Sequence, residues 1–196
     1  MSETPGHQPV RKAGRDRPED AALRAIEFLL LDVDGVLTDG RIHFDFEGRE
    51  YKSFHVHDAA GIVYWHRAGG RSGFLSGRGG DIVERRAKEL GVHDVVLGRT
   101  DKAEAFEELL KRQNLTADRV AYVGDDLLDL PVLQQVGFAA TVPEARKEVL
   151  AAAQFVTERS GGFGAARGAI AEPLRAPGVW QSVIDDGGRA GSECSP

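Results

Sequence analysis

The chain alternates short apolar runs with longer segments in which apolar residues recur at helical spacing. The apolar runs with the length and flanking turn residues of buried strands are residues 26–31, 71–75, 94–97, 119–123, 137–141 and 154–157. The segments of helical spacing lie between them, at residues 59–68, 80–90, 101–113, 126–135, 143–152 and 165–174. Strands that alternate with helices in this way are typical of a mostly parallel sheet covered on both faces. The pattern therefore predicts the α/β fold class.

The stretch after the first predicted strand has a different pattern. Ile42, Phe44 and Phe46 alternate with polar residues, Glu47-Gly48 supplies a turn, and residues 51–54 form the returning strand. This pattern predicts a β-hairpin, which is either a flap over a site at the strand ends or an ordinary edge hairpin.

Three histidines in and after this stretch are candidate metal ligands. On a strand that continues past residue 54, His55 and His57 would face the same way and could bind a metal ion together with His43. The alternative is that they form the polar face of the hairpin.

Composition narrows the class of protein. The 196 residues include 31 acidic and 25 basic side chains, and a net charge of -6 argues against a dedicated nucleic-acid binder. Cys194 is the single cysteine, which excludes an intrachain disulfide and fits a reducing compartment. The apolar runs are far shorter than the ~20 residues of a membrane span, and the first residues lack a signal-type apolar stretch. We therefore expect a cytoplasmic protein.

The two ends of the chain differ in composition from its middle. Residues 1–22 mix proline, glycine and both charge signs, which predicts a flexible N-terminal arm. Residues 176–196 are rich in glycine, serine and proline, which predicts a flexible C-terminal tail. The expected folded domain is residues 23–175.

The first candidate site is Asp32-Val33-Asp34-Gly35, directly after the first predicted strand. In open α/β sheets, functional groups gather at the carboxyl ends of strands. Acids in such a loop can instead serve as turn or helix-cap residues. A calcium loop is disfavoured, because the ligand positions five and twelve would be Val36 and His43.

Two further motifs carry groups that could hold an anion. Ser76-Gly77-Arg78 ends a predicted strand before a helix, where a hydroxyl and backbone N–H groups can bind phosphate; a plain turn or N-cap is the alternative. Lys102 opens a predicted helix, where its charge opposes the helix dipole by a few tenths of a kcal/mol or so unless an anion lies nearby. A solvated surface lysine is the other reading.

The last motif, Gly124-Asp125-Asp126-Leu127-Leu128-Asp129, follows another predicted strand. Carboxylates this close repel one another unless a cation or protons neutralise them. Magnesium prefers hard oxygen ligands and bridges readily to phosphate, so Mg²⁺ is the expected cofactor. Helix capping would account for Asp126 alone more easily than for Asp125 and Asp129 together.

In this order, the four motifs resemble those of the haloacid dehalogenase superfamily of phosphohydrolases, over residues 26–170. Within it, the chain is most similar to the small cap-less group of 3-deoxy-D-manno-octulosonate 8-phosphate phosphatases and related nonulosonate 9-phosphate phosphatases. Further matches to that group are Asp58-Ala59-Ala60-Gly61-Ile62, the segment 121–133, and Gly161-Gly162-Phe163-Gly164-Ala165-Ala166-Arg167. The resemblance implies a Rossmann-like doubly wound sheet with a hairpin flap and no separate cap domain.

The resemblance also implies a mechanism. Asp32 would be the nucleophile that forms an aspartyl-phosphate, and Asp34 the general acid and base, with a pKa raised by neighbouring carboxylates. Mg²⁺ would be held by Asp32, the Asp34 backbone carbonyl and Asp125, with Asp126 and Asp129 in or near the second shell. Ser76 and Lys102 would bind the remaining phosphoryl oxygens.

The implied substrate is a phosphorylated sugar acid, whose carboxylate calls for cations at the mouth of the site. Arg78 and Arg167 are the candidates, with Lys52 behind them, and Ser76-Gly77-Arg78 favours the octulosonate branch over the nonulosonate one. In the resembled group, neighbouring subunits close each site within a homotetramer, and the octulosonate branch belongs to lipopolysaccharide biosynthesis. No nucleic acid or membrane is expected as a partner.

Two other functions compete with this interpretation. A module of the same fold serves as a non-catalytic oligomerisation domain in some sialate cytidylyltransferases, but there the motif residues are lost and here all four motifs are present. A phosphoacceptor receiver domain also uses acids, a hydroxyl and a lysine. Its acceptor follows the third strand, however, whereas Asp32 follows the first.

Overall fold

The computed structural model describes residues 13–175, 181 and 183–184, and the remaining parts of the predicted arm and tail lie outside this range. Its centre is a six-stranded sheet of order β5-β4-β1-β6-β7-β8, in which every neighbouring pair is parallel. The strands are β1 (Phe28–Leu31), β4 (Arg71–Leu75), β5 (Asp94–Val96), β6 (Val120–Val123), β7 (Phe138–Thr141) and β8 (Phe155–Val156). The predicted parallel α/β sheet is confirmed.

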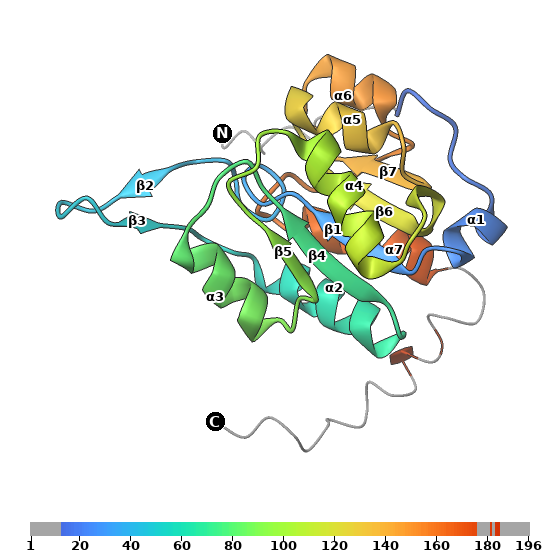
Figure 1. The fold of residues 1–196 in the computed structure, drawn as a ribbon, viewed down its shortest axis with the longest axis horizontal. Helices are drawn as coiled ribbons and strands as arrows, with labels where there is room; N and C mark the ends of the chain where they lie inside the picture. The colour runs from blue at the N-terminus through green and yellow to red at the C-terminus, as the bar shows by residue number, and fades with distance from the viewer. Residues whose placement is uncertain (1–12, 176–180, 182, 185–196) are drawn as a thin grey trace, which may run out of the picture.

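Helices cover both faces of this sheet (Figure 1). One apolar layer packs beneath α1 (Asp20–Arg24), α2 (Val56–Arg67), α3 (Asp81–Glu89) and α7 (Ala165–Leu174). The opposite layer packs beneath α4 (Lys102–Gln113), α5 (Leu130–Leu133) and α6 (Lys147–Ala152). Short 3₁₀ helices, η1 (Ala117–Arg119) and η2 (Leu127–Asp129), flank β6.

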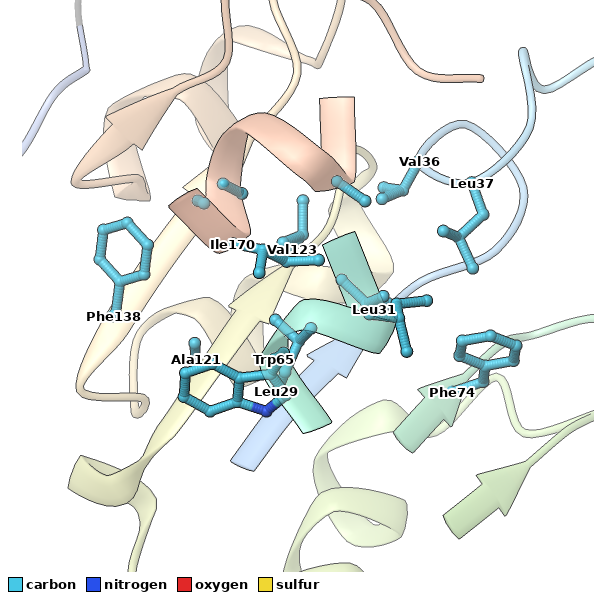
Figure 2. Close-up of a cluster of buried hydrophobic side chains, with 14 of the residues drawn as sticks. Leu29, Leu31, Val36, Leu37, Trp65, Phe74, Ala121, Val123, Phe138 and Ile170 are labelled. Atoms are coloured by element: carbon cyan, nitrogen blue, oxygen red, sulfur yellow. The ribbon is translucent and has the colours of Figure 1, made fainter. Parts of the chain in front are cut away.

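The central strand β1 shows how the two layers share one apolar run. Leu29 and Leu31 face the layer of α2 and α7, where they belong to the same buried cluster as Trp65 and Ile170 (Figure 2). Phe28 and Leu30 face the opposite layer. Because successive side chains of a strand point to opposite faces, a strand buried on both sides is apolar throughout. The uninterrupted run thus reflects the burial of β1 on both faces, in the interior of the sheet.

Two predicted helices have different bounds in the structure. The helix expected from residue 59 begins at Val56, because the His55 ring accepts a hydrogen bond from the His57 N–H and caps it. The helix expected over residues 126–135 is instead the 3₁₀ turn η2 followed by the short α5, which has Pro131 in its first turn.

The predicted hairpin is present and extends away from the body of the molecule (Figure 1). Its paired strands are short, β2 (His43–Phe44) and β3 (Glu50–Tyr51), and they run antiparallel. Phe46 near its tip is 94% exposed. Farther along, Phe54 packs against the core, so the returning segment leads directly into α2.

Residues that precede β1 contact the body of the domain. The Gly14 N–H donates to the Leu150 carbonyl at 2.9 Å, and the Arg15 N–H donates to the Ala153 carbonyl at 2.9 Å. Helix α1 starts at Asp20 and buries Leu23. The contacts therefore reach back into the second half of the predicted arm, as far as Gly14. Among the described residues, no helix is long and apolar enough to cross a membrane.

Candidate active site

The register of the sheet brings the predicted motifs to one edge. Leu31 at the end of β1 pairs with Phe74 of β4 and with Val123 of β6. Asp32 is the next residue after Leu31, and its N–H donates to the Val123 carbonyl at 2.9 Å. Ser76 and Asp125 come two residues after Phe74 and Val123, so they flank Asp32 on its two sides. The crossover topology thereby assembles groups that are far apart in the sequence.

The carboxylates of Asp32, Asp125 and Asp129 form a compact cluster. Each offers an oxygen, and these oxygens all lie within 4.8 Å of one another. The ammonium of Lys102 lies 3.0 Å from Asp32 Oδ1 and 2.5 Å from Asp129 Oδ1, and its side chain is buried. Burial lowers the pKa of Lys102, but the charges of Asp32 and Asp129 outweigh that effect and raise it. The expectation that Lys102 needs an anionic partner is confirmed.

Asp129 is already saturated with hydrogen bonds. Its Oδ1 accepts from Lys102 and from the Tyr122 hydroxyl, the latter at 2.6 Å. Its Oδ2 accepts from the N–H groups of Asp125 and Asp126, at 2.8 and 3.0 Å. This capping arrangement starts η2 and uses the lone pairs that a metal would need. Asp129 therefore supports the loop, and Asp32 and Asp125 remain the available ligands.

Two glycines make the close approach of these loops possible. A Cβ at Gly35 would lie 2.2 Å from Asp125 Oδ2, and Gly35 has a φ of +101° that side chains rarely adopt. A Cβ at Gly124 would lie 2.5 Å from the Asp129 carboxyl carbon. Any larger residue at either position would push the carboxylates apart.

The charge state of the cluster fits a divalent cation. Burial, together with repulsion from Asp32 and Asp129, raises the pKa of Asp125 to about 8. Burial also raises the pKa of Asp32 to about 6, against the opposing charge of Lys102. Asp125 Oδ1 is buried without a hydrogen-bond partner. Adjacent carboxylates whose pKa values are raised, with one orphaned oxygen, are the donor set that Mg²⁺ would complete.

Asp34 lies in a different environment from Asp32. Its Oδ1 contacts the Lys52 ammonium, and its Oδ2 lies 3.9 Å from Nε of Arg78. Glu50 joins both cations, 3.0 Å from Lys52 and 3.1 Å from Arg78. The sequence interpretation expected a pKa of Asp34 raised by neighbouring carboxylates, whereas the ionic contacts of Asp34 are with two cations, Lys52 from the hairpin and Arg78 from the turn after β4. Lys52, expected at the mouth of the site, is buried against Asp34 instead.

Ser76 lies buried at the end of β4, at the same edge as the cluster. Its N–H donates to the Val96 carbonyl at 2.9 Å, and its hydroxyl accepts from the Arg78 N–H at 3.2 Å. A serine held in this way presents its hydroxyl in a tight turn before α3. Arg78 leaves this turn toward Glu50 and Asp34, with a side chain that is 44% exposed.

Arg167 contacts α2. Its guanidinium lies over the Tyr64 ring, 5.2 Å from the centroid, and its backbone N–H donates to Asp58 Oδ1 at 2.8 Å. Tyr64 comes eight residues after the start of α2, about 12 Å along the helix axis from its first residue. These two contacts therefore place Arg167 along α2.

The loop before α7 has a structural contact with the first motif. A Cβ at Gly161 would lie 1.8 Å from the Gly35 carbonyl oxygen, and the Gly162 N–H donates to the Val36 carbonyl at 3.0 Å. The glycines of this segment, noted in the sequence, therefore let it cover the loop that carries Asp32 and Asp34.

The histidine cluster considered in the sequence is wrong. His55 and His57 lie at the cap and first turn of α2, not on a strand, and their rings meet edge to face at 4.8 Å. His43 lies in β2, where it stacks on Tyr51. The alternation of the hairpin ends at β3, so the period-two argument does not reach these residues.

Tyr122 and Glu50 were missed in the sequence. Tyr122 lies within the apolar β6, where its ring packs in the core while its hydroxyl reaches Asp129 and Lys102. A single tyrosine in a buried strand carries no sequence signal for that role. Glu50 is one of many surface-type acids, and only the path of the hairpin brings it to Arg78.

Comparisons with known proteins agree with this geometry. A family model described as haloacid dehalogenase-like hydrolase matches residues 80–166, which include Lys102 and Asp125. The chain is 40% identical over 163 residues to the 3-deoxy-D-manno-octulosonate 8-phosphate phosphatase of Haemophilus influenzae, covering 83% of this chain and 90% of that protein. It is 39% identical to the enzyme of Escherichia coli K12, over 72% of this chain and 76% of that one.

Solved structures extend the likeness to the fold. The phosphatase of the same name from Moraxella catarrhalis, in complex with magnesium, phosphate and KDO, superposes with a TM-score of 0.82 at 34% identity. The match covers 85% of this chain and 95% of that one. The cobalt-bound Haemophilus influenzae structure has a TM-score of 0.78 at 39% identity, over 84% of this chain and 95% of that one.

Proposed function

The chain belongs to the haloacid dehalogenase-like hydrolases, and from that premise we propose that it is a Mg²⁺-dependent phosphatase of 3-deoxy-D-manno-octulosonate 8-phosphate. The family membership predicted from the four motifs is confirmed, and it makes the chain a phosphoric monoester hydrolase. The choice of substrate rests on relatives that carry this activity in their names and align over most of their length.

The observation that carries the proposal is the buried cluster of Asp32, Asp125 and Lys102. Its carboxylate oxygens lie within reach of one ion, and the Lys102 ammonium lies 3.0 Å from Asp32. A non-catalytic oligomerisation module would have no use for such groups, because burying charged side chains at this density costs several kcal/mol per ion.

In this proposal Asp32 is the nucleophile. An Asp32 carboxylate oxygen attacks phosphorus, the ester P–O bond breaks, and the leaving sugar oxygen takes a proton from Asp34. Water then attacks the phosphorus of the aspartyl-phosphate while Asp34 accepts its proton, which releases inorganic phosphate and restores Asp32. Asp34 suits this work because Oδ2 is its oxygen without a hydrogen-bond partner.

The remaining groups bind and neutralise charge. Asp32, Asp125 and the backbone carbonyl of Asp34 would hold Mg²⁺. Its charge would reduce the electrostatic repulsion between the anionic nucleophile and the phosphoryl group. Lys102 and the Ser76 hydroxyl would bind phosphoryl oxygens, and Arg78 the substrate carboxylate. Arg167 was also a candidate for binding that carboxylate, but its guanidinium lies over the Tyr64 ring of α2.

A substrate panel tests the proposal. With Mg²⁺ present, we expect the octulosonate 8-phosphate to give the highest kcat/KM, ahead of nonulosonate 9-phosphates and simple sugar phosphates. Equal, slow turnover of every ester would contradict the substrate while leaving the hydrolase class in place. No turnover of any phosphate ester would remove the function altogether.

We also propose a homotetramer. The hairpin exposes apolar side chains that a second chain could cover, among them Ile42, Phe44, Phe46 and Tyr51. A monomer mass in light scattering at micromolar concentration would contradict it. A cytoplasmic location and a place in lipopolysaccharide biosynthesis stay predictions that follow from the substrate.

A further inference from the structure

Lys52 is the least expected buried charge among the residues that the structure describes. It follows β3 directly, at the base of a hairpin that is otherwise exposed, yet its side chain is only 2% exposed. Lysine is almost never fully buried unless it is paired. Its ammonium contacts Asp34 Oδ1 and lies 3.0 Å from Glu50 Oε1. Two carboxylates from separate segments therefore compensate its burial.

The contact with Lys52 distinguishes the two oxygens of Asp34. Oδ1 is engaged by the ammonium, whereas Oδ2 is buried without a hydrogen-bond partner and lies 3.9 Å from Nε of Arg78. A carboxylate held by one oxygen keeps a single orientation, so its free oxygen is presented in a defined direction. Proton transfer needs that donor within hydrogen-bond reach of the leaving oxygen.

Glu50 restrains the position of the Lys52 ammonium. It bridges Lys52 and Arg78, at 3.0 and 3.1 Å, and it belongs to β3. The position of the ammonium is thus tied to the base of the hairpin and to the turn after Ser76, the two segments that border Asp34.

We propose that Lys52 is a positioning residue that orients Asp34, with Oδ1 held and Oδ2 left to exchange the proton with the leaving group and water. The inference rests on the proposed function, since it assigns Lys52 a part in the acid–base half of that reaction. It also makes the hairpin of the same chain a component of its own site, in addition to any role at a subunit interface.

A positioning role for Lys52 has a kinetic consequence that a purely structural role lacks. A sugar alkoxide is a poor leaving group and needs its proton at once, whereas p-nitrophenolate leaves without one. Misplacing Asp34 should therefore slow phosphoryl transfer from the sugar phosphate far more than transfer from p-nitrophenyl phosphate. Because kcat/KM reports events up to the first irreversible step, it isolates this transfer from later hydrolysis of the aspartyl-phosphate.

The experiment compares Lys52→Met, Lys52→Arg and a control, Lys147→Met, at saturating Mg²⁺. Lys147 is exposed on α6 and pairs only weakly with Glu148, at 3.9 Å. For octulosonate 8-phosphate we expect Lys52→Met to lower kcat/KM at least tenfold more than it does for p-nitrophenyl phosphate. The loss should lie in kcat and not in KM, because a lost contact between Arg78 and the substrate would raise KM instead. Lys52→Arg should recover much of the loss, and the control should match the wild type on both esters.

Two results would overturn the inference. Equal losses on both esters would mean that Lys52 only maintains the fold, and no loss on either would mean that it does not orient Asp34. A wild type inactive on every ester would instead contradict the proposed function.

Thermal melting gives a readout that needs no activity. If the pair is coupled as described, the double variant Lys52→Met/Asp34→Asn should melt well above the value expected from adding the two single shifts. Additive shifts would overturn the proposal whatever the kinetics.

Discussion

Asp32 and Asp34 are two residues apart in one loop, yet they belong to different regions of the molecule. Asp32 lies among carboxylates contributed by the loop after β6, with Lys102 as the compensating cation. Asp34 lies among cations contributed by the hairpin and by the turn after β4, namely Lys52 and Arg78. The first region concentrates negative charge that can bind a metal ion. In the second region, the cations neutralise the charge of Asp34.

This difference separates two chemical tasks. A nucleophile that must approach a phosphate benefits from a nearby divalent ion, which requires ligands gathered around it. An acid–base group needs a fixed orientation and a free oxygen, which a single ionic contact can supply. Two identical side chains in one motif thus have different surroundings, which suit the separate roles proposed for them.

The largest expected effect is on the nucleophile itself. Asp32→Asn removes the attacking carboxylate with almost no change of shape, and we expect kcat to fall by about 10⁴-fold or more. Steady-state turnover of octulosonate 8-phosphate measures it, and a beryllofluoride adduct should form on the wild type alone.

A matched control for that variant is Asp101→Asn. Asp101 caps α4 by accepting from the Glu104 N–H, and asparagine caps a helix equally well. Its kcat should equal that of the wild type. Near-normal turnover by Asp32→Asn would remove Asp32 from the nucleophile role.

The next effect is on stability and compares the two buried lysines. Lys102→Met leaves Asp32 and Asp129 without their cation, and breaking a buried pair costs about 3–5 kcal/mol. We expect a lower midpoint in urea than for Lys52→Met, because Asp34 keeps Arg78 nearby. Equal midpoints would mean that losing Lys102 and losing Lys52 lower the free energy of unfolding by the same amount.

A smaller effect distinguishes the two arginines proposed for the substrate carboxylate. Arg78→Gln should raise KM for the octulosonate ester about tenfold, the scale of one charged hydrogen bond, and should spare p-nitrophenyl phosphate. Arg167→Gln should instead lower stability by ~1 kcal/mol through the lost contact with Tyr64. A KM change of the same size in Arg167→Gln would restore it to the substrate site.

The smallest effect is a pH dependence of the metal-free protein. The folded-state pKa values of Asp32 and Asp125 are raised to about 6 and about 8, so the folded chain binds more protons than the unfolded one above pH ~4. This stability contribution is complete below pH ~4 and is lost as pH rises to about 8. Calorimetry in a chelator should therefore show Tm falling between pH 5 and 8.

Magnesium and one substitution complete that test. Mg²⁺ should raise Tm more at pH 8 than at pH 6, since protons compete with the metal. Asp125→Asn should flatten the pH dependence and abolish most of the Mg²⁺ effect. A Tm that is independent of pH in the chelator would contradict the charge state inferred for the cluster.

Local patterns predicted the parts of the molecule that depend on local physics. The uninterrupted run through Leu29 and Leu31 predicted a strand buried on both faces, and that strand lies in the interior of the sheet, between β4 and β6. The charge of Lys102 at a helix start predicted an anionic partner, because the dipole makes such a position unfavourable alone. In each case the physical reason lies within a few residues of the position.

The errors occurred where an element changed type. The histidines after the hairpin were interpreted with a period of two, but the His55 ring caps a helix and ends the strand pattern. The acids expected around Asp34 came from the family resemblance, whereas its cationic contacts come from the hairpin and from the turn after β4. Hydrophobic periodicity predicts neither the start of α2 after His55 nor the cationic contacts of Asp34. Both depend on the path of the chain through and after the hairpin.

The sequence by itself determined the α/β class, the order of the strands along the chain and the four motifs at strand ends, since burial and turn chemistry are local. Only the tertiary structure decided which acids gather in one cluster and which lies against cations. Asp129 is saturated by Lys102, Tyr122 and two backbone N–H groups, and Asp34 is held by Lys52, through contacts between segments distant in the chain. Such pairings depend on the crossover of β6 beside β1 and on the path of the hairpin, which no local pattern encodes.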